Sequence, residues 1–66
     1  MTLLIAYRII EHYGDADPPE PFGYEFLHGT PSVGDLVTLH WLDGREAHRV
    51  RVESISGTTL HVRVAS

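Results

Sequence analysis

The chain has 66 residues, of which 42% are hydrophobic and 21% charged, and its formal net charge is −4. This composition is typical of a globular protein, and the length fits one small domain, which we assign to residues 1–66. The chain has no cysteine, which excludes disulfides and thiolate metal ligands, and no apolar run is long enough to predict a membrane-spanning helix.

Residues 3–13 fit two kinds of element. On a helix, their apolar side chains would cover a broad arc opposite Arg8, Glu11 and His12, and Gly14 would end the helix. As a strand, the segment is apolar on both faces, and its isoleucines and tyrosines favour this conformation, as do the strand patterns downstream. We therefore predict a strand, with an N-terminal helix at 3–13 packed on a β-meander as the alternative α+β fold.

Three of the four prolines lie in residues 14–23, together with three acidic residues. Proline has no N–H group to donate, so it is unsuited to a helix interior or an inner strand, and we predict an extended surface loop. Residues 22–28 then alternate in polarity. Phe22, Tyr24 and Phe26 fall on one face, which predicts a half-buried strand with its aromatic face inward.

The next pattern predicts a hairpin with strands at residues 35–42 and 45–54. An Asp-Gly dipeptide joins them, which indicates a two-residue type I′ turn, because that turn needs positive φ at both central positions. In the resulting register, Trp41 lies opposite Glu46.

This register divides the hairpin into two faces, because cross-strand neighbours share a face. The core face carries Val37, Leu39, Trp41, His48, Val50 and Val52, and the outer face carries Thr38, His40, Arg45, Arg49 and Arg51. His40 and His48 therefore lie on opposite faces and are not expected to share a metal ion. Trp41 is interpreted as an anchor at the edge of the core, with ligand stacking as the alternative.

The last strand is predicted at residues 59–66, after a three-residue loop at 56–58. A bulge near Ser54 is needed to turn Ile55 into the core. The predicted core is then mainly aliphatic: Ile5, Tyr7, Ile9, Phe26, Val37, Leu39, Val50, Val52, Leu60, Val62 and Val64.

The order of these elements resembles that of SH3-like small barrels. A proline-containing loop separates the first two strands, "PSVGDLVTL" opens a central strand, and two tight hairpins follow. The resemblance implies an all-β fold, a small five-stranded SH3-like barrel.

The chain lacks the sequence signs of catalysis. It has no GxSxG motif and no glycine-rich phosphate loop, and its serines fall in predicted turns or at the terminus. Asp15, Asp17 and Glu20 lie close together, but the prolines among them depart from a calcium-binding loop, so we interpret them as a solvated acidic loop. We predict that the protein is not an enzyme and has no cofactor or metal.

Arginine is distributed unevenly. Residues 1–35 carry one arginine against six acids, whereas residues 36–66 carry four arginines against three acids, and the chain has no lysine. Arginine suits protein interfaces because it buries well and donates directed hydrogen bonds. Our candidate partner-binding residues are accordingly Arg49, Arg51, Arg63 and His40, with Trp41 and Tyr24 as an aromatic edge.

These features favour a protein-interaction or assembly module with a protein partner, expected to be acidic. It would be a component of a larger complex, such as a viral particle, or an inhibitor that docks on an enzyme. The alternative is a nucleic-acid-binding small barrel that uses the arginine face. Residues 1–10 lack the features of a signal peptide, so we expect a cytoplasmic location and no membrane partner.

Overall fold

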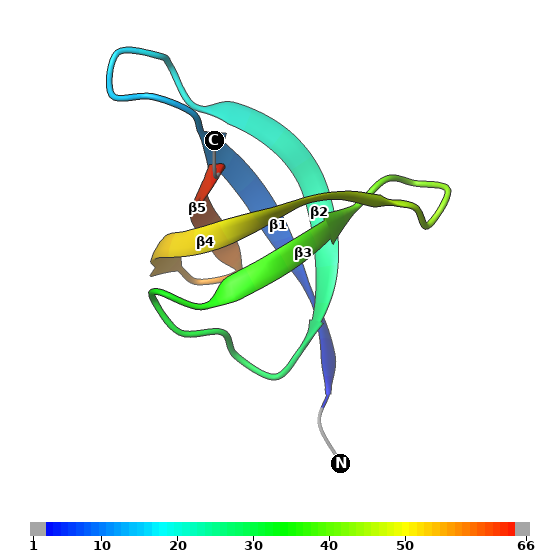
Figure 1. The fold of residues 1–66 in the computed structure, drawn as a ribbon. Coiled ribbons are helices and arrows are strands. Elements are labelled where there is room, and N and C mark those ends of the chain that lie inside the picture. Colours follow the sequence, from blue (N-terminus) through cyan, green and yellow to red (C-terminus); the bar gives the residue numbers. More distant parts are fainter. Residues whose placement is uncertain (1–2, 65–66) are drawn as a thin grey trace.

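The computed structural model describes residues 3–64, and every regular element in that range is a strand (Figure 1). The strands are β1 (Leu4–His12), β2 (Glu20–His28), β3 (Leu36–His40), β4 (Glu46–Ser56) and β5 (Thr59–Val64). The all-β prediction is confirmed, and the alternative helix at 3–13 is wrong. Tertiary pairing on both sides of β1 settles what the local sequence left open. None of the described residues forms a helix able to cross a membrane.

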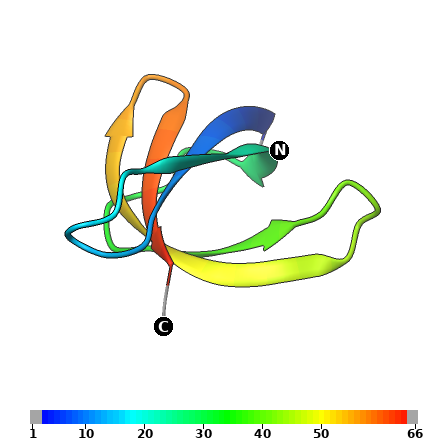
Figure 2. The same ribbon diagram turned by 90° about the horizontal axis from the view of Figure 1, so that it is seen from above.

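The five strands form one sheet in the order β2-β1-β5-β4-β3. β1 lies antiparallel to β2 and parallel to β5, and the other pairs are antiparallel. The sheet curls on itself into a half-barrel, so that β3 and β4 cross in front of β1 and β2 (Figures 1 and 2). No ladder joins β2 to β3, which leaves both strands as free edges.

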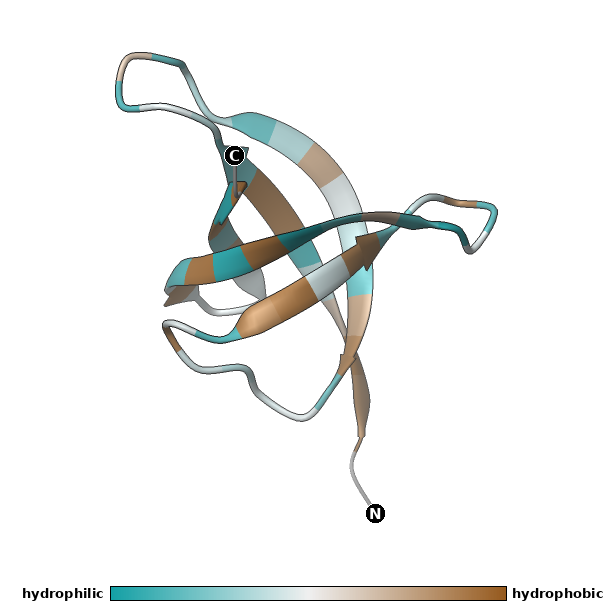
Figure 3. Cartoon of the chain, viewed as in Figure 1, coloured by the Kyte–Doolittle hydropathy of each residue, from teal (hydrophilic) through white to brown (hydrophobic). Residues whose placement is uncertain are grey.

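Aliphatic side chains fill the inside of the curl. Along β4, hydrophobic and hydrophilic residues alternate as predicted, whereas β3 is mainly hydrophobic (Figure 3). The buried apolar residues, all of which were predicted, are Tyr7, Ile9, Val37, Leu39, Val50, Val52, Leu60 and Val62. Ile5 and Val64 are partly buried and pack against this cluster. Phe26 is 63% exposed, so its assignment to the core is wrong.

The face of β2 is inverted relative to the prediction. β1 pairs Ala6 with Phe26 and Tyr7 with Glu25, and each cross-strand pair shares a face. Because Tyr7 points into the core, Glu25 follows it inward, and Phe26 turns outward with Ala6. A register shift at Phe22 then returns this one aromatic ring to the core side.

The hairpin between β3 and β4 has the predicted register along most of its length, but its register differs from the prediction next to the turn. Leu39 lies opposite His48, as predicted, but His40 lies opposite Glu46 because of a bulge. Trp41 N–H donates to Arg45 O, so Trp41 does not face Glu46. In the described residues only glycines have positive φ, so the type I′ turn is also wrong. The loop is a three-residue turn with Gly44 at φ 88°.

The hairpin between β4 and β5 contains the predicted bulge. The register shifts between Val52 and Ser54, and Ile55 packs against the core. The predicted three-residue loop is wrong, because Ser56 pairs with Thr59 around a two-residue turn. Gly57 has φ 59° at the first central position, which fits a type II′ turn.

Candidate partner-binding groove

The six candidate residues fall into two groups in the structure. Tyr24, His40 and Trp41 come together, whereas the arginines lie apart from them on other strands. The first group lines a groove of about 380 Å³ at the free edges of β2 and β3. We call it the edge groove, and its lining residues are Tyr24, Glu25, Phe26, His40, Trp41, Leu42 and Gly44.

The edge groove has apolar sides that remain exposed to solvent. Tyr24 and Phe26 are 68% and 63% exposed, and Trp41 is 48% exposed. Leu42 projects from the turn with its side chain fully in solvent. The face inversion of β2 and the bulge before the turn together create this surface. Sequence alternation alone assigned the aromatic face of β2 to the core.

A polar bridge spans the edge groove. Nδ1 of His40 lies 2.5 Å from Oε1 of Glu25, which joins the two edge strands. Glu25 is only 8% exposed, whereas the side chain of His40 is 42% exposed. A buried carboxylate needs a partner that satisfies its oxygens, and the more exposed histidine supplies that partner.

A second acid–histidine pair lies further inside the curl. Nε2 of His48 bonds to Oε2 of Glu11, and the hydroxyl of Tyr13 donates to Oε1 of Glu11 at 3.0 Å. Both oxygens of this buried carboxylate therefore have partners. The hydrogen bond to the carboxylate, with smaller effects of desolvation and of nearby acids, raises the pKa of Tyr13.

Aromatic contacts connect the second pair to the edge groove. The ring of Phe22 lies 5.4 Å from that of Trp41 and 5.7 Å from that of His48, measured between centroids. Trp41 also meets His48 edge-on at 6.5 Å. Trp41 is thus packed on one side and exposed on the other. The predicted position of His48 at the margin of the core agrees with this packing.

Sequence reasoning missed both glutamates. A signal for Glu11 was present, because it follows Tyr7 and Ile9 at the alternating positions that point into the core. No comparable signal identified Glu25, since its orientation depends on the register between β1 and β2. His40 and His48 each pair with a different glutamate.

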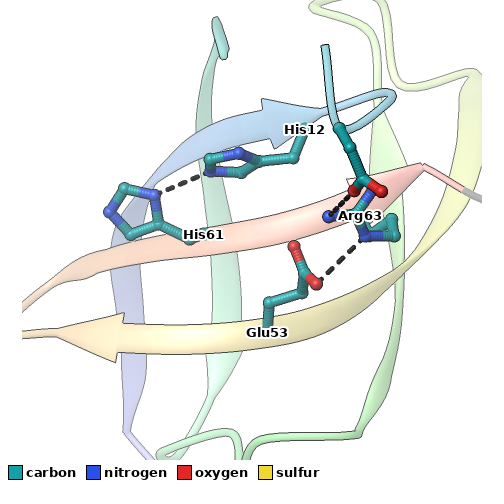
Figure 4. A network of polar contacts seen from close by, with 5 residues as sticks. His12, Glu53, His61 and Arg63 are labelled. Atoms are coloured by element: carbon teal, nitrogen blue, oxygen red, sulfur yellow. Dashed lines mark hydrogen bonds and ion pairs between the residues drawn. The ribbon is translucent and has the colours of Figure 1, made fainter. Parts of the chain in front are cut away.

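The arginines occupy the outer face of β4 and β5. Arg51 and Arg63 are cross-strand neighbours, and Arg51 donates to the carbonyl of Gly34 at 3.0 Å. Arg63 is held by two acids: Glu53 at 3.0 Å and Asp15 at 3.7 Å (Figure 4). The hydrogen bond that Arg63 donates to Glu53 raises the pKa of Arg63 further above its ordinary value.

Arg8 and Arg49 are also exposed, and among the described residues their charge is not balanced by an ion pair. In residues 3–64, neither Arg8 nor Arg49 forms an ion pair. Arg8 lies opposite Tyr24 on the outer face, and Arg49 lies opposite Thr38 of β3. Each edge strand therefore has an exposed cation on its neighbouring strand. We retain Arg49 and Arg51 as candidates and find Arg63 already engaged within the domain.

A smaller cavity of about 290 Å³ lies at the loop between β1 and β2. It is lined by Tyr13, Asp17, Pro18 and Glu20.

Comparison with known proteins does not assign the chain to a family. No protein-family model, curated protein or solved structure matches the chain.

Proposed function

We propose that this domain is a non-catalytic protein-interaction module whose partner docks in the edge groove as an extended segment. The observation that carries the proposal is the exposure of large apolar side chains around one groove at two free strand edges. Contiguous apolar surface framed by polar groups is typical of protein-interaction sites. Assembly into a larger complex, such as a viral particle, or docking on an enzyme as an inhibitor would each use such a surface.

The free edges favour an extended partner. An edge strand presents unpaired N–H and C=O groups, to which a further strand can add. The start of β2 is protected from such pairing by Pro21 and by the bulge at Phe22. Residues 24–28 carry no proline or bulge, and this is the part of β2 that displays Tyr24 and Phe26.

Charge favours an acidic partner. The exposed guanidinium groups of Arg8 and Arg49 flank the edge strands, while the carboxylate of Glu25 is buried and paired with His40. A partner with Asp or Glu beside its apolar residues would complement these cations. We also propose a cytoplasmic setting, in line with the expectation from the sequence.

Two observations favour a protein over a nucleic acid as the partner. Arg63 is neutralised by Glu53 and Asp15, which weakens the basic surface. The exposed aromatic rings lie in the edge groove and not among the arginines, whereas single-stranded nucleic acids are held by aromatic stacking within a basic groove.

Selection from a displayed random-peptide library on the immobilised domain tests the proposal. We expect enriched peptides with large apolar residues at alternating positions, because side chains alternate along a strand, and with flanking Asp or Glu. The double variant Tyr24→Ser/Phe26→Ser should bind such a peptide at least about tenfold more weakly, roughly 1.4 kcal/mol.

Val33→Ser is the matched control, because Val33 is equally exposed and lies outside the edge groove. Equal binding by the double variant and the control would overturn the proposal, once circular dichroism shows that both variants are folded. The nucleic-acid alternative predicts a different outcome. Oligonucleotide binding would fall steeply with salt and would be insensitive to Tyr24→Ser/Phe26→Ser.

A further inference from the structure

A pair of histidines on the outer side of the sheet lies away from the edge groove. Nε2 of His12 is 3.0 Å from Nδ1 of His61, and the ring centroids are 5.2 Å apart (Figure 4). The two residues lie on β1 and β5, which are inner strands hydrogen-bonded on both sides. Their backbone positions are therefore fixed by the sheet.

The separation of the two nitrogens matches what a chelated ion requires. Imidazole nitrogens bind Zn²⁺ at about 2.0–2.1 Å. If the N–Zn–N angle lies between its octahedral and tetrahedral values, the two nitrogens are about 2.9–3.4 Å apart. The observed 3.0 Å lies within this interval. An ion would sit about 1.4 Å to the side of the line between the nitrogens, so both rings would have to rotate by about 40° to point their lone pairs at it.

The charges nearby favour a cation. Arg63 is the cross-strand neighbour of His12, and it is bonded to Glu53 and to Asp15. Two carboxylates thus surround one guanidinium, which leaves this group with a net charge of −1. The positive charge of Arg63 is compensated before any metal ion approaches.

We propose that His12 and His61 form a two-histidine site for a divalent first-row transition ion such as Zn²⁺, Ni²⁺ or Cu²⁺. Imidazole ligands suit these ions, and Cu²⁺ binds most tightly of the three. Within residues 3–64, no cluster of three or more His, Cys, Asp or Glu side chains is placed to hold a metal. Water or a partner's side chain therefore completes the coordination, and the hydrogen bond between the rings is replaced by the ion.

Titration of untagged protein with Cu²⁺, followed by NMR, tests the site without any substitution. The paramagnetic ion should first broaden the resonances of residues around positions 12 and 61. Broadening that begins around His28, His40 or His48 would overturn the proposal.

Calorimetric titration with Zn²⁺ provides the second measurement. His12→Gln and His61→Gln should each weaken Zn²⁺ binding at least tenfold, because one remaining imidazole cannot chelate the ion. The double variant should bind Zn²⁺ no more weakly than either single variant. His28→Gln is the control, since His28 is exposed at the end of β2. Single variants that bind within threefold of the unmodified protein, or an equal loss in His28→Gln, would contradict a shared site.

Discussion

The closed and the open sides of the half-barrel are held together by different chemistry. On the closed side, β1, β5 and β4 are continuously paired, and Ile9, Leu60 and Val62 are fully buried between the curled parts of the sheet. On the open side, where β2 and β3 are not paired, Glu25 bonds to His40 across the two edge strands. Glu11 bonds to His48 between β1 and β4, the strands next to these edges.

The difference follows from access to water. Paired strands exclude water, so aliphatic burial stabilises the closed side. Where the strands diverge, water remains near, and partly exposed histidines satisfy the buried carboxylates. No buried side-chain nitrogen or oxygen among residues 3–64 lacks a partner. The open side can therefore leave aromatic side chains free for a partner, whereas the closed side supplies most of the stability.

The largest expected effect is on the closed side. Leu60→Ala removes a side chain with 0% exposure and should lower the free energy of unfolding by about 2–4 kcal/mol, through lost burial and the remaining cavity. Denaturant unfolding measures this change. Val33→Ala, at an exposed position, should change it by less than about 0.5 kcal/mol. Similar losses in both variants would remove the distinction between core and surface.

A smaller effect is expected on the open side. Glu11→Ala leaves His48 and Tyr13 without their shared acceptor and should cost about 1–2 kcal/mol, because both partners are partly exposed and can bond to water. Glu53→Ala is the matched control, since it breaks an ion pair of the surface and should cost much less. If the two variants unfold at the same denaturant concentration, the inner pair is not a structural bridge.

The smallest effect concerns pH. The hydrogen bond to Glu11 raises the pKa of Tyr13 in the folded state. The contribution of Tyr13 to stability is therefore fully present below the ordinary tyrosine pKa of about 10 and is lost as pH rises through the raised value. NMR titration of the Tyr13 ring should show a lower pKa in Glu11→Gln than in the unmodified protein. An unchanged pKa would exclude the carboxylate of Glu11 as the cause.

Local alternation in the sequence determined much of the closed side. The aliphatic residues of β4 and β5 were assigned to the correct face, because residues two apart in a strand share a face whatever the partner strand is. The bulge near Ser54 was also predictable, since Ile55 could enter the core only if the register shifted there. These inferences needed only the chain's own periodicity.

Only the tertiary structure decided the open side. The inward face of β2 depends on its register with β1, where Glu25 follows Tyr7 and Phe26 follows Ala6. The contacts between His40 and Glu25 and between His48 and Glu11 join residues 15 and 37 positions apart, so no local pattern indicates them. A one-residue slip in pairing exchanges the two faces of a strand, and alternation within that strand is the same in either register. The sequence by itself therefore indicated the later strands and which of their aliphatic faces are buried. Pairing within the curled sheet decided that residues 4–12 form a strand and which aromatic side chains remain at the edge groove.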